Sequence, residues 1–177
     1  MQKRKSLRLK NYDYSQNGMY FVTICTQNKQ YFFGSIINGE MKLNLAGKVV
    51  EKWWKELENK FNIQLHEYVI MPNHIHGIIE INNFVGADLC VRQYVDTKGQ
   101  THRSAPTISE MMQWYKTMTT NDYIKNVKLG NLPRFNKQIW QRSYYDHIIR
   151  KEESLQKIKE YIMINPRDWK KDELYNN

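Results

Sequence analysis

The segment from residue 64 to residue 81 constrains the fold more than any other part of this chain. Two runs rich in β-branched and aromatic residues, Gln64–Met71 and His74–Ile81, are separated by Pro72, which interrupts an extended backbone. We therefore predict two neighbouring antiparallel strands. Alternate side chains of the second strand face opposite sides of the sheet. One side is a core face of Ile75, Gly77, Ile79 and Ile81, and the other carries His74, His76, Ile78 and Glu80.

The remaining pattern mixes further strands with helices. Strands are predicted at 20–26, 31–37 and 139–149, and Asn38-Gly39 is typical of a hairpin turn leading into residues 40–43. Helices are predicted from the Asn44 cap to about Lys60, from Thr107 or Ser109 to a break at 130–133, and over 151–164. This order favours an α+β fold, ferredoxin-like or RRM-like, with an antiparallel sheet and helices packed on one face.

Length and composition are typical of one folded domain. We predict a single domain over 1–177, with a basic N-terminal arm at 1–11 and a long loop at 82–106. The chain has no run of apolar residues long enough to cross a bilayer and no apolar segment after its basic N-terminus. Cys25 and Cys90 lack metal-site spacing and are interpreted as reduced thiols. We therefore expect a cytoplasmic protein that does not bind membranes.

The charge balance favours a polyanionic partner. The chain carries a formal net charge of +9, and 13% of its residues are aromatic. Basic residues neutralise phosphates and aromatic side chains stack on bases, so the composition indicates a nucleic acid. The alternative is a solvated basic surface that binds no polyanion.

His74 and His76 are candidate metal ligands. Two imidazoles on one side of a strand can hold one face of a divalent ion and leave the other face open. The spacing by itself is weak evidence, because two histidines satisfied by hydrogen bonds explain it as well. Two imidazoles are also an incomplete site, so further ligands must come from elsewhere in the chain.

The last predicted helix carries the candidates for completing that site. Tyr161 and Asn165 are four residues apart and lie on one face of the helix, with Lys157 on the same side one turn earlier. A phenol, an amide and an ammonium group could supply a nucleophile, a metal ligand and a phosphate contact. The alternative is that Tyr161 packs at the edge of the core and Asn165 only ends the helix before Pro166.

Four sequence blocks in this order resemble the REP-associated tyrosine transposases, a branch of the single-tyrosine transposases named for their His-hydrophobic-His (HUH) motif. The resemblance extends from about residue 12 to residue 170. The blocks are Tyr20-Phe-Val-Thr-Ile-Cys-Thr26, Tyr68-Val-Ile-Met-Pro-Asn-His-Ile-His-Gly-Ile78, Trp140-Gln-Arg-Ser-Tyr-Tyr-Asp-His-Ile-Ile-Arg150 and Tyr161-Ile-Met-Ile-Asn-Pro166.

The resemblance implies an HUH endonuclease fold and a specific chemistry. His74 and His76 would bind Mg²⁺ or Mn²⁺, Tyr161 would be the nucleophile, and Asn165 would be a further metal ligand. Such an enzyme nicks single-stranded DNA next to hairpin or palindromic elements through a 5′-phosphotyrosine intermediate and rejoins it, in some members as a homodimer.

Basic side chains are expected to contact the DNA. The alternative for each of them is ordinary solubility, and the alternative for the whole chain is a non-catalytic module that binds hairpins or single strands on an RRM-like sheet. The candidate DNA contacts are Lys3, Arg4, Lys5, Arg8, Lys10, Arg142, Arg150 and Lys157.

Overall fold

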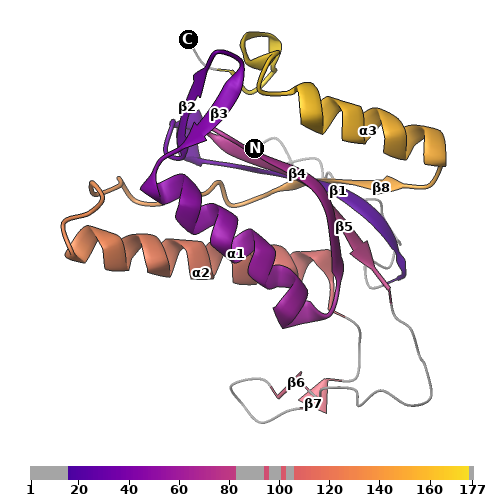
Figure 1. Cartoon of the computed structure of the whole chain (residues 1–177). Coiled ribbons are helices and arrows are strands. Elements are labelled where there is room, and N and C mark those ends of the chain that lie inside the picture. Colours follow the sequence, from indigo (N-terminus) through magenta and orange to yellow (C-terminus); the bar gives the residue numbers. More distant parts are fainter. Residues whose placement is uncertain (1–15, 83–93, 96–100, 103–105, 176–177) are drawn as a thin grey trace, which may run out of the picture.

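A four-stranded antiparallel sheet forms the centre of the protein in a computed structural model that describes residues 16–82, 94–95, 101–102 and 106–175. Figure 1 shows helices on both sides of this sheet. Its strand order is β4-β5-β1-β8. The four strands are β1 (Gly18–Cys25), β4 (Gln64–Met71), β5 (His74–Ile81) and β8 (Tyr145–Ile149).

The two strands predicted around Pro72 are confirmed with the predicted bounds. β4 and β5 pair antiparallel, and β5 pairs with β1 on its other side, so β5 lies in the interior of the sheet. His76 is opposite Thr23 in β1 and Val69 in β4. A strand that is bonded on both sides has a fixed register, and the register decides which side chains of β5 share a face.

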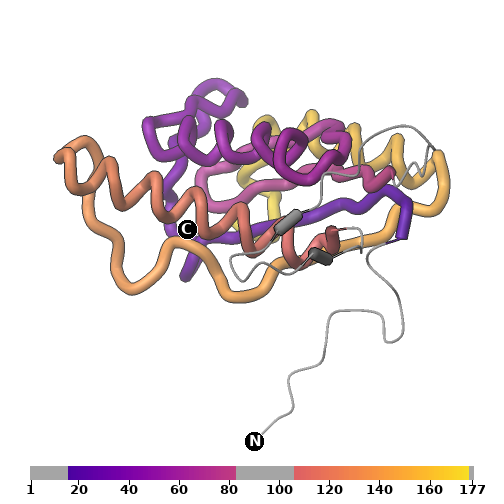
Figure 2. The backbone as a smooth tube through the Cα atoms, turned by 90° about the horizontal axis from the view of Figure 1, so that it is seen from below, coloured from indigo at the N-terminus to yellow at the C-terminus, as the bar shows by residue number. Residues whose placement is uncertain are grey.

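The α+β prediction is confirmed, but the helices divide between the two faces. Helices α1 (Leu45–Phe61) and α2 (Ile108–Lys128) cover one face and lie side by side, as Figure 2 shows. Helix α3 (Glu152–Ile164) packs on the opposite face (Figure 1). The expectation that all helices share one face was wrong, because Ile78 and its neighbours make the histidine face of β5 apolar enough to hold a helix.

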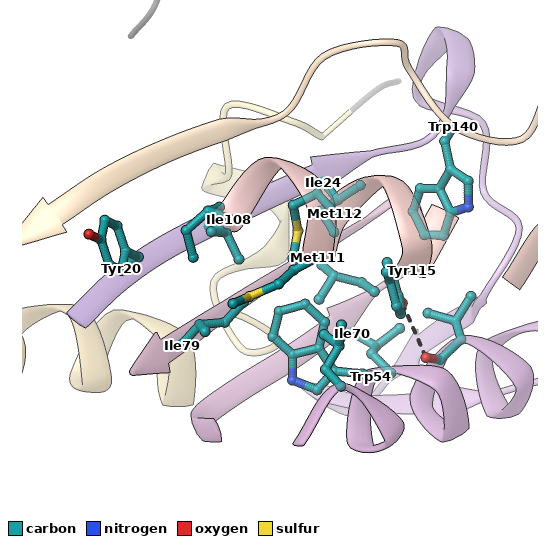
Figure 3. Packing of buried hydrophobic residues seen from close by; sticks show 14 of the residues in the cluster. Tyr20, Ile24, Trp54, Ile70, Ile79, Ile108, Met111, Met112, Tyr115 and Trp140 are labelled. Carbon is teal, nitrogen blue, oxygen red and sulfur yellow. Dashed lines mark hydrogen bonds between the residues drawn. The ribbon is translucent and has the colours of Figure 1, made fainter. Parts of the chain in front are cut away.

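The larger core lies between the sheet and the α1–α2 pair (Figure 3). Trp54 of α1 packs against Gly77, where an added Cβ atom would come within 2.3 Å of the indole ring. The Tyr115 hydroxyl of α2 donates a hydrogen bond to the Val50 carbonyl of α1 over 3.1 Å, drawn as the dashed line in Figure 3. Trp54 therefore supports β5 on the face away from its histidines, and the Tyr115 bond joins the two helices that cover that face.

Capping residues mark where α1 and α2 begin. The Asn44 side chain accepts a hydrogen bond from the backbone N–H of Gly47, as an N-cap residue does. Thr107 and Glu110 form a reciprocal capping box at the start of α2, which settles the predicted choice in favour of Thr107.

Two short hairpins lie outside the central sheet. β2 (Gly34–Ile37) and β3 (Glu40–Leu43) pair through the predicted Asn38-Gly39 turn, where both residues have positive φ. β6 (Tyr94–Val95) and β7 (Thr101–His102) pair within the predicted loop at 82–106. The rest of that loop and the N-terminal arm at 1–11 lie outside the described residues.

The strand predicted over 139–149 is shorter than expected. Only Tyr145–Ile149 forms β8, although Trp140 makes an isolated bridge to Thr26. The carbonyls of Gln141 and Ser143 instead accept hydrogen bonds from the Lys116 ammonium, both at 2.9 Å. These carbonyls are satisfied without a neighbouring strand, so the segment does not extend the ladder.

After α3 the chain turns back toward the end of the sheet where β5 begins. A short 3-10 helix, η2 (Trp169–Lys171), is followed by residues 172–175, and its Trp169 packs against His74. A second 3-10 helix, η1 (Gln27–Lys29), follows β1. Within the described part of the chain, every helix is too short or too polar to cross a bilayer.

Candidate metal and nucleophile site

The structure brings His74, His76, Tyr161 and Asn165 to one place. The Tyr161 hydroxyl of α3 lies 3.1 Å from Nε2 of His76 on β5. Leu155 and Ile162 of α3 are buried against Ile78 of the sheet. With that side of α3 buried, Tyr161 is directed toward the two histidines.

Within the described part of the chain, the hydrogen bonds around His74 leave one nitrogen of its ring without a partner. The Asn73 amide NH₂ donates to the carbonyls of Lys29 and Leu174, so its Oδ1 must accept from His74 Nδ1, 2.7 Å away. The His74 proton therefore sits on Nδ1, and Nε2 carries a lone pair. His74 is buried, and its Nε2 has no hydrogen-bond partner among the described residues.

Both ring nitrogens of His76 have a partner, Thr23 at Nδ1 and Tyr161 at Nε2. Its Nδ1 lies 2.8 Å from the Thr23 hydroxyl on the adjacent strand, and Phe21 stacks on the ring with centroids 5.3 Å apart. Burial lowers the pKa of His76 to about 4, and Asp172 opposes that shift only in part. Burial, followed by the neighbouring His76, also lowers the pKa of His74 well below its usual value. Both imidazoles are therefore neutral at pH 7, as metal binding requires.

Asp172 completes this cluster, although the sequence interpretation did not include it. The nearest ligand atoms of His74, His76 and Asp172 all lie within 4.8 Å of one another. One oxygen of Asp172 accepts hydrogen bonds from the Tyr161 hydroxyl at 3.1 Å and from the Asn165 amide at 2.9 Å. The Asn165 Oδ1 atom is buried and has no hydrogen-bond partner within the part of the chain that the structure describes.

Tyr161 is a poor nucleophile in this environment without a nearby cation. Burial raises the pKa of Tyr161 well above its usual value of about 10, and the negative charge of Asp172 raises it further. Its side chain is still 39% exposed, so a substrate can reach it. A positive charge placed in the cluster would reverse this electrostatic effect and favour the phenolate.

The residues present fit a divalent cation. Buried polar atoms are normally paired. Among the described residues, however, the His74 Nε2 atom and the Asn165 Oδ1 atom, both acceptors, have no partner and lie beside a carboxylate. A positive ion can bind the lone pairs of both acceptor atoms. Imidazole nitrogens with carboxylate and amide oxygens form a donor set suited to first-row divalent ions.

Three residues of the site were missed by the sequence interpretation. Thr23 and Asn73 each bond a histidine Nδ1 atom, and both lie inside the quoted sequence blocks, which was the available signal. Asp172 stands in the charged run Lys170-Lys171-Asp172-Glu173, which is typical of solvated surface. Only the turn after α3 brings its carboxylate back to the cluster.

Three of the predicted DNA contacts lie in the described part of the chain, and all three are exposed. Lys157 is exposed on α3, one turn before Tyr161, while Arg142 and Arg150 are exposed just before and just after β8. Lys3, Arg4, Lys5, Arg8 and Lys10 lie outside the described residues. A role in binding DNA stays a prediction for all eight.

Comparison with known proteins places the chain in a family. No model of a described protein family matches the sequence. A protein of Haemophilus influenzae, named only as uncharacterized, is 41% identical over 174 residues, which make up 97% of this chain and 93% of that protein. The chain belongs to the family of that Haemophilus protein.

The fold is shared with a solved transposase. The structure of a REP-associated tyrosine transposase bound to a REP hairpin superposes with a TM-score of 0.55. The match covers 92% of this chain and 74% of the transposase chain, at 16% sequence identity. The antiparallel α+β fold expected of an HUH endonuclease is therefore confirmed.

Proposed function

We propose that this chain is a REP-associated tyrosine transposase that nicks single-stranded DNA next to a hairpin and rejoins it. One observation carries the proposal. The Tyr161 hydroxyl lies 3.1 Å from both His76 Nε2 and an Asp172 oxygen, beside two buried acceptor atoms that have no partner among the described residues. A nucleophile next to a site fitted for a cation is the arrangement that attack on a phosphodiester requires.

A divalent cation, Mg²⁺ or Mn²⁺, would be held by His74, His76 and Asp172, with the Asn165 amide oxygen as a further ligand. Bound there, the ion would neutralise negative charge on the phosphate and lower the pKa of the nearby phenol. Asn73 holds the His74 imidazole in the tautomer that presents Nε2 to the ion, and the Thr23 hydroxyl, 2.8 Å from His76 Nδ1, helps to orient the second ring.

Tyr161 would form the covalent intermediate. Its oxygen bonds to phosphorus while the bond from phosphorus to the 3′ oxygen breaks, which leaves a 5′-phosphotyrosine and a 3′-hydroxyl. The hydrogen bond from Tyr161 directs the phenol proton toward Asp172. Attack by a 3′-hydroxyl on the phosphotyrosine reverses the step and restores a phosphodiester. The intermediate keeps the energy of the original bond, so rejoining needs no ATP.

The substrate assignment follows from charge and from the related fold. The net charge of +9 suits a polyanion, and the solved transposase of the same fold was bound to a REP hairpin. The assignment to single-stranded DNA beside a hairpin belongs to this proposal. The single domain, the cytoplasmic location and the homodimer stay predictions.

Adduct formation tests the proposal. The chain is incubated with Mn²⁺ or Mg²⁺ and labelled single strands taken from the DNA on both sides of its gene, and covalent complexes are resolved on a denaturing gel. We expect an adduct with the unmodified chain and none after Tyr161→Phe or with excess EDTA. Tyr145→Phe is the matched control, because Tyr145 is also an exposed tyrosine on the α3 side of the sheet.

Two results would contradict the proposal. An adduct that survives Tyr161→Phe would assign the nucleophile to another residue. Hairpin binding that EDTA does not change, with no strand cleaved, would favour the non-catalytic binding module.

A further inference from the structure

We propose that Glu67 and Lys159 are positioning residues that set the rotation of helix α3 about its own axis and so hold Tyr161 at the metal cluster. The two residues form an ion pair between β4 and α3, with Lys159 Nζ 3.1 Å from Glu67 Oε1. This inference deepens the proposed function and rests on it, because it concerns the placement of the nucleophile of that reaction.

A β-bulge in β4 directs the Glu67 side chain toward α3. Between Leu65 and Tyr68, two residues of β4 lie opposite the single residue Ile78 of β5. Leu65 and Tyr68 both pack in the larger core, although residues three apart in a regular strand face opposite sides. The two residues between them, His66 and Glu67, both border a cleft against the end of α3. In an unbroken ladder Glu67 would face the core, so the bulge re-aims this carboxylate.

The ion pair is partly shielded from water. The Lys159 side chain is 25% exposed, and the Glu67 Oε2 atom is buried with no hydrogen-bond partner among the described residues. Burial raises the pKa of Glu67, but the backbone N–H of Glu67 and the Lys159 ammonium together outweigh that effect, and the pKa lies below its usual value. A carboxylate that is partly removed from water depends on the partner that it retains, so the pair favours one arrangement of α3 on β4.

Lys159 and Tyr161 lie on the two flanks of the side of α3 that packs on the sheet. Successive residues of a helix are about 100° apart around its axis, which places Lys159 and Tyr161 on opposite flanks of the buried Ile162. Lys159 reaches the edge strand β4, and Tyr161 reaches His76 on β5. A roll of the helix that separates Lys159 from Glu67 must therefore also displace Tyr161.

Apolar packing alone fixes this rotation only weakly. The hydrophobic effect has no preferred direction, so the stripe of apolar side chains under α3 tolerates a small roll. Beside the ion pair, a cleft of about 650 Å³ lies between β4 and the end of α3, with Val69 and Met163 on its walls. Met163 is 72% exposed and does not fill this cleft. The flank that carries Lys159 therefore depends on a polar contact.

A small roll of α3 is enough to disturb the reaction. Side chains extend about 5 to 6 Å from a helix axis, so a roll of about 10° moves the Tyr161 hydroxyl by about 1 Å. That hydroxyl lies 3.1 Å from both His76 Nε2 and an Asp172 oxygen, and neither hydrogen bond would survive such a shift. A misplacement of about 1 Å can slow an enzymatic reaction about a hundredfold.

Rates of adduct formation at saturating DNA test the positioning role. Glu67→Gln keeps the shape of the side chain and removes its charge. We expect the rate to fall about tenfold to a hundredfold, while the Kd for the DNA strand stays within about twofold of that of the unmodified chain. The double variant Glu67→Lys with Lys159→Glu should recover most of the rate, because it restores an ion pair. Glu160→Gln, which changes an exposed carboxylate of the same helix, is the matched control and should keep the full rate.

Nitration reports the position of Tyr161 without any DNA. Tetranitromethane attacks the phenolate form of tyrosine, and peptide mass spectrometry identifies each nitrated residue. Burial and then Asp172 raise the pKa of Tyr161 in the unmodified chain, so its nitration should be slow. In Glu67→Gln we expect nitration of Tyr161 to be about tenfold faster, the effect of lowering a pKa by about one. Tyr145, which is exposed on β8, should react at the same rate in every variant.

Unchanged nitration of Tyr161 in Glu67→Gln would overturn the inference, whatever the rate of adduct formation. Faster nitration with an unchanged adduct rate would also overturn it, as would a double variant that behaves like Glu67→Gln. Failure of the proposed function gives a different result. Faster nitration in Glu67→Gln, with no adduct from any chain, would support the positioning of Tyr161 and overturn the catalytic proposal.

Discussion

Replacing His76 by glutamine should make the free energy of unfolding less sensitive to a fall in pH from 7 to 4. The His76 side chain is only 4% exposed, and burial lowers its pKa from 6.5 to about 4. Below pH 6.5 the unfolded chain takes up a proton at this position while the folded chain does not, so stability falls as the pH falls toward 4. The difference between the two pKa values corresponds to about 3 kcal/mol of unfolding free energy.

Urea unfolding in metal-free buffer at several values between pH 7 and pH 4 measures this loss. The unmodified chain should lose about 3 kcal/mol more than His76→Gln over that interval. Comparing slopes removes the contribution of carboxylates, which titrate in both chains. His147→Gln is the control, because His147 is an exposed histidine on β8. Parallel pH profiles for the unmodified chain and His76→Gln would refute the claim that His76 is buried in its neutral form.

Three further outcomes follow from the structure. Mn²⁺ at a hundred times its Kd should raise the Tm by about 5 to 10 °C, and His74→Ala should abolish this shift in a thermal scan while the His147→Gln control keeps it. Gly77→Ala should destabilise the chain by about 1 to 3 kcal/mol in urea unfolding, since its methyl group would overlap Trp54; an unchanged midpoint would contradict that packing. Asn44→Ala should cost about 1 kcal/mol in the same assay, because Gly47 N–H loses its cap, and Asn44→Ser should recover most of it.

The elements that the sequence predicts best are those with strong local signals. The bounds of β4 and β5 follow from β-branched residues that stop at Pro72, and α1 begins after the predicted Asn44 cap. The strand expected from residue 139 begins only at Tyr145. Its backbone groups bond to Lys116 of α2, a contact that no local pattern in residues 139–144 could indicate.

The candidate site was predictable where its residues lie on regular elements. His74 and His76 share a face of β5, and Tyr161 and Asn165 share a side of α3, so periodicity indicated both pairs. Which face of the sheet α3 covers was not predictable, since its apolar stripe could pack on either side. Asp172 depends on an irregular turn after α3, and neither its neighbours nor its spacing distinguishes it from a surface carboxylate.

Identifying the amino acid that carries the DNA tests the central claim most directly. The adduct formed with a hairpin-bearing strand and Mn²⁺ is trimmed with nuclease and digested with protease, and the modified peptide is sequenced by mass spectrometry. The site described here predicts that the nucleotide is linked to the Tyr161 oxygen. A nucleotide linked to Tyr144, Tyr145 or any other residue would contradict it.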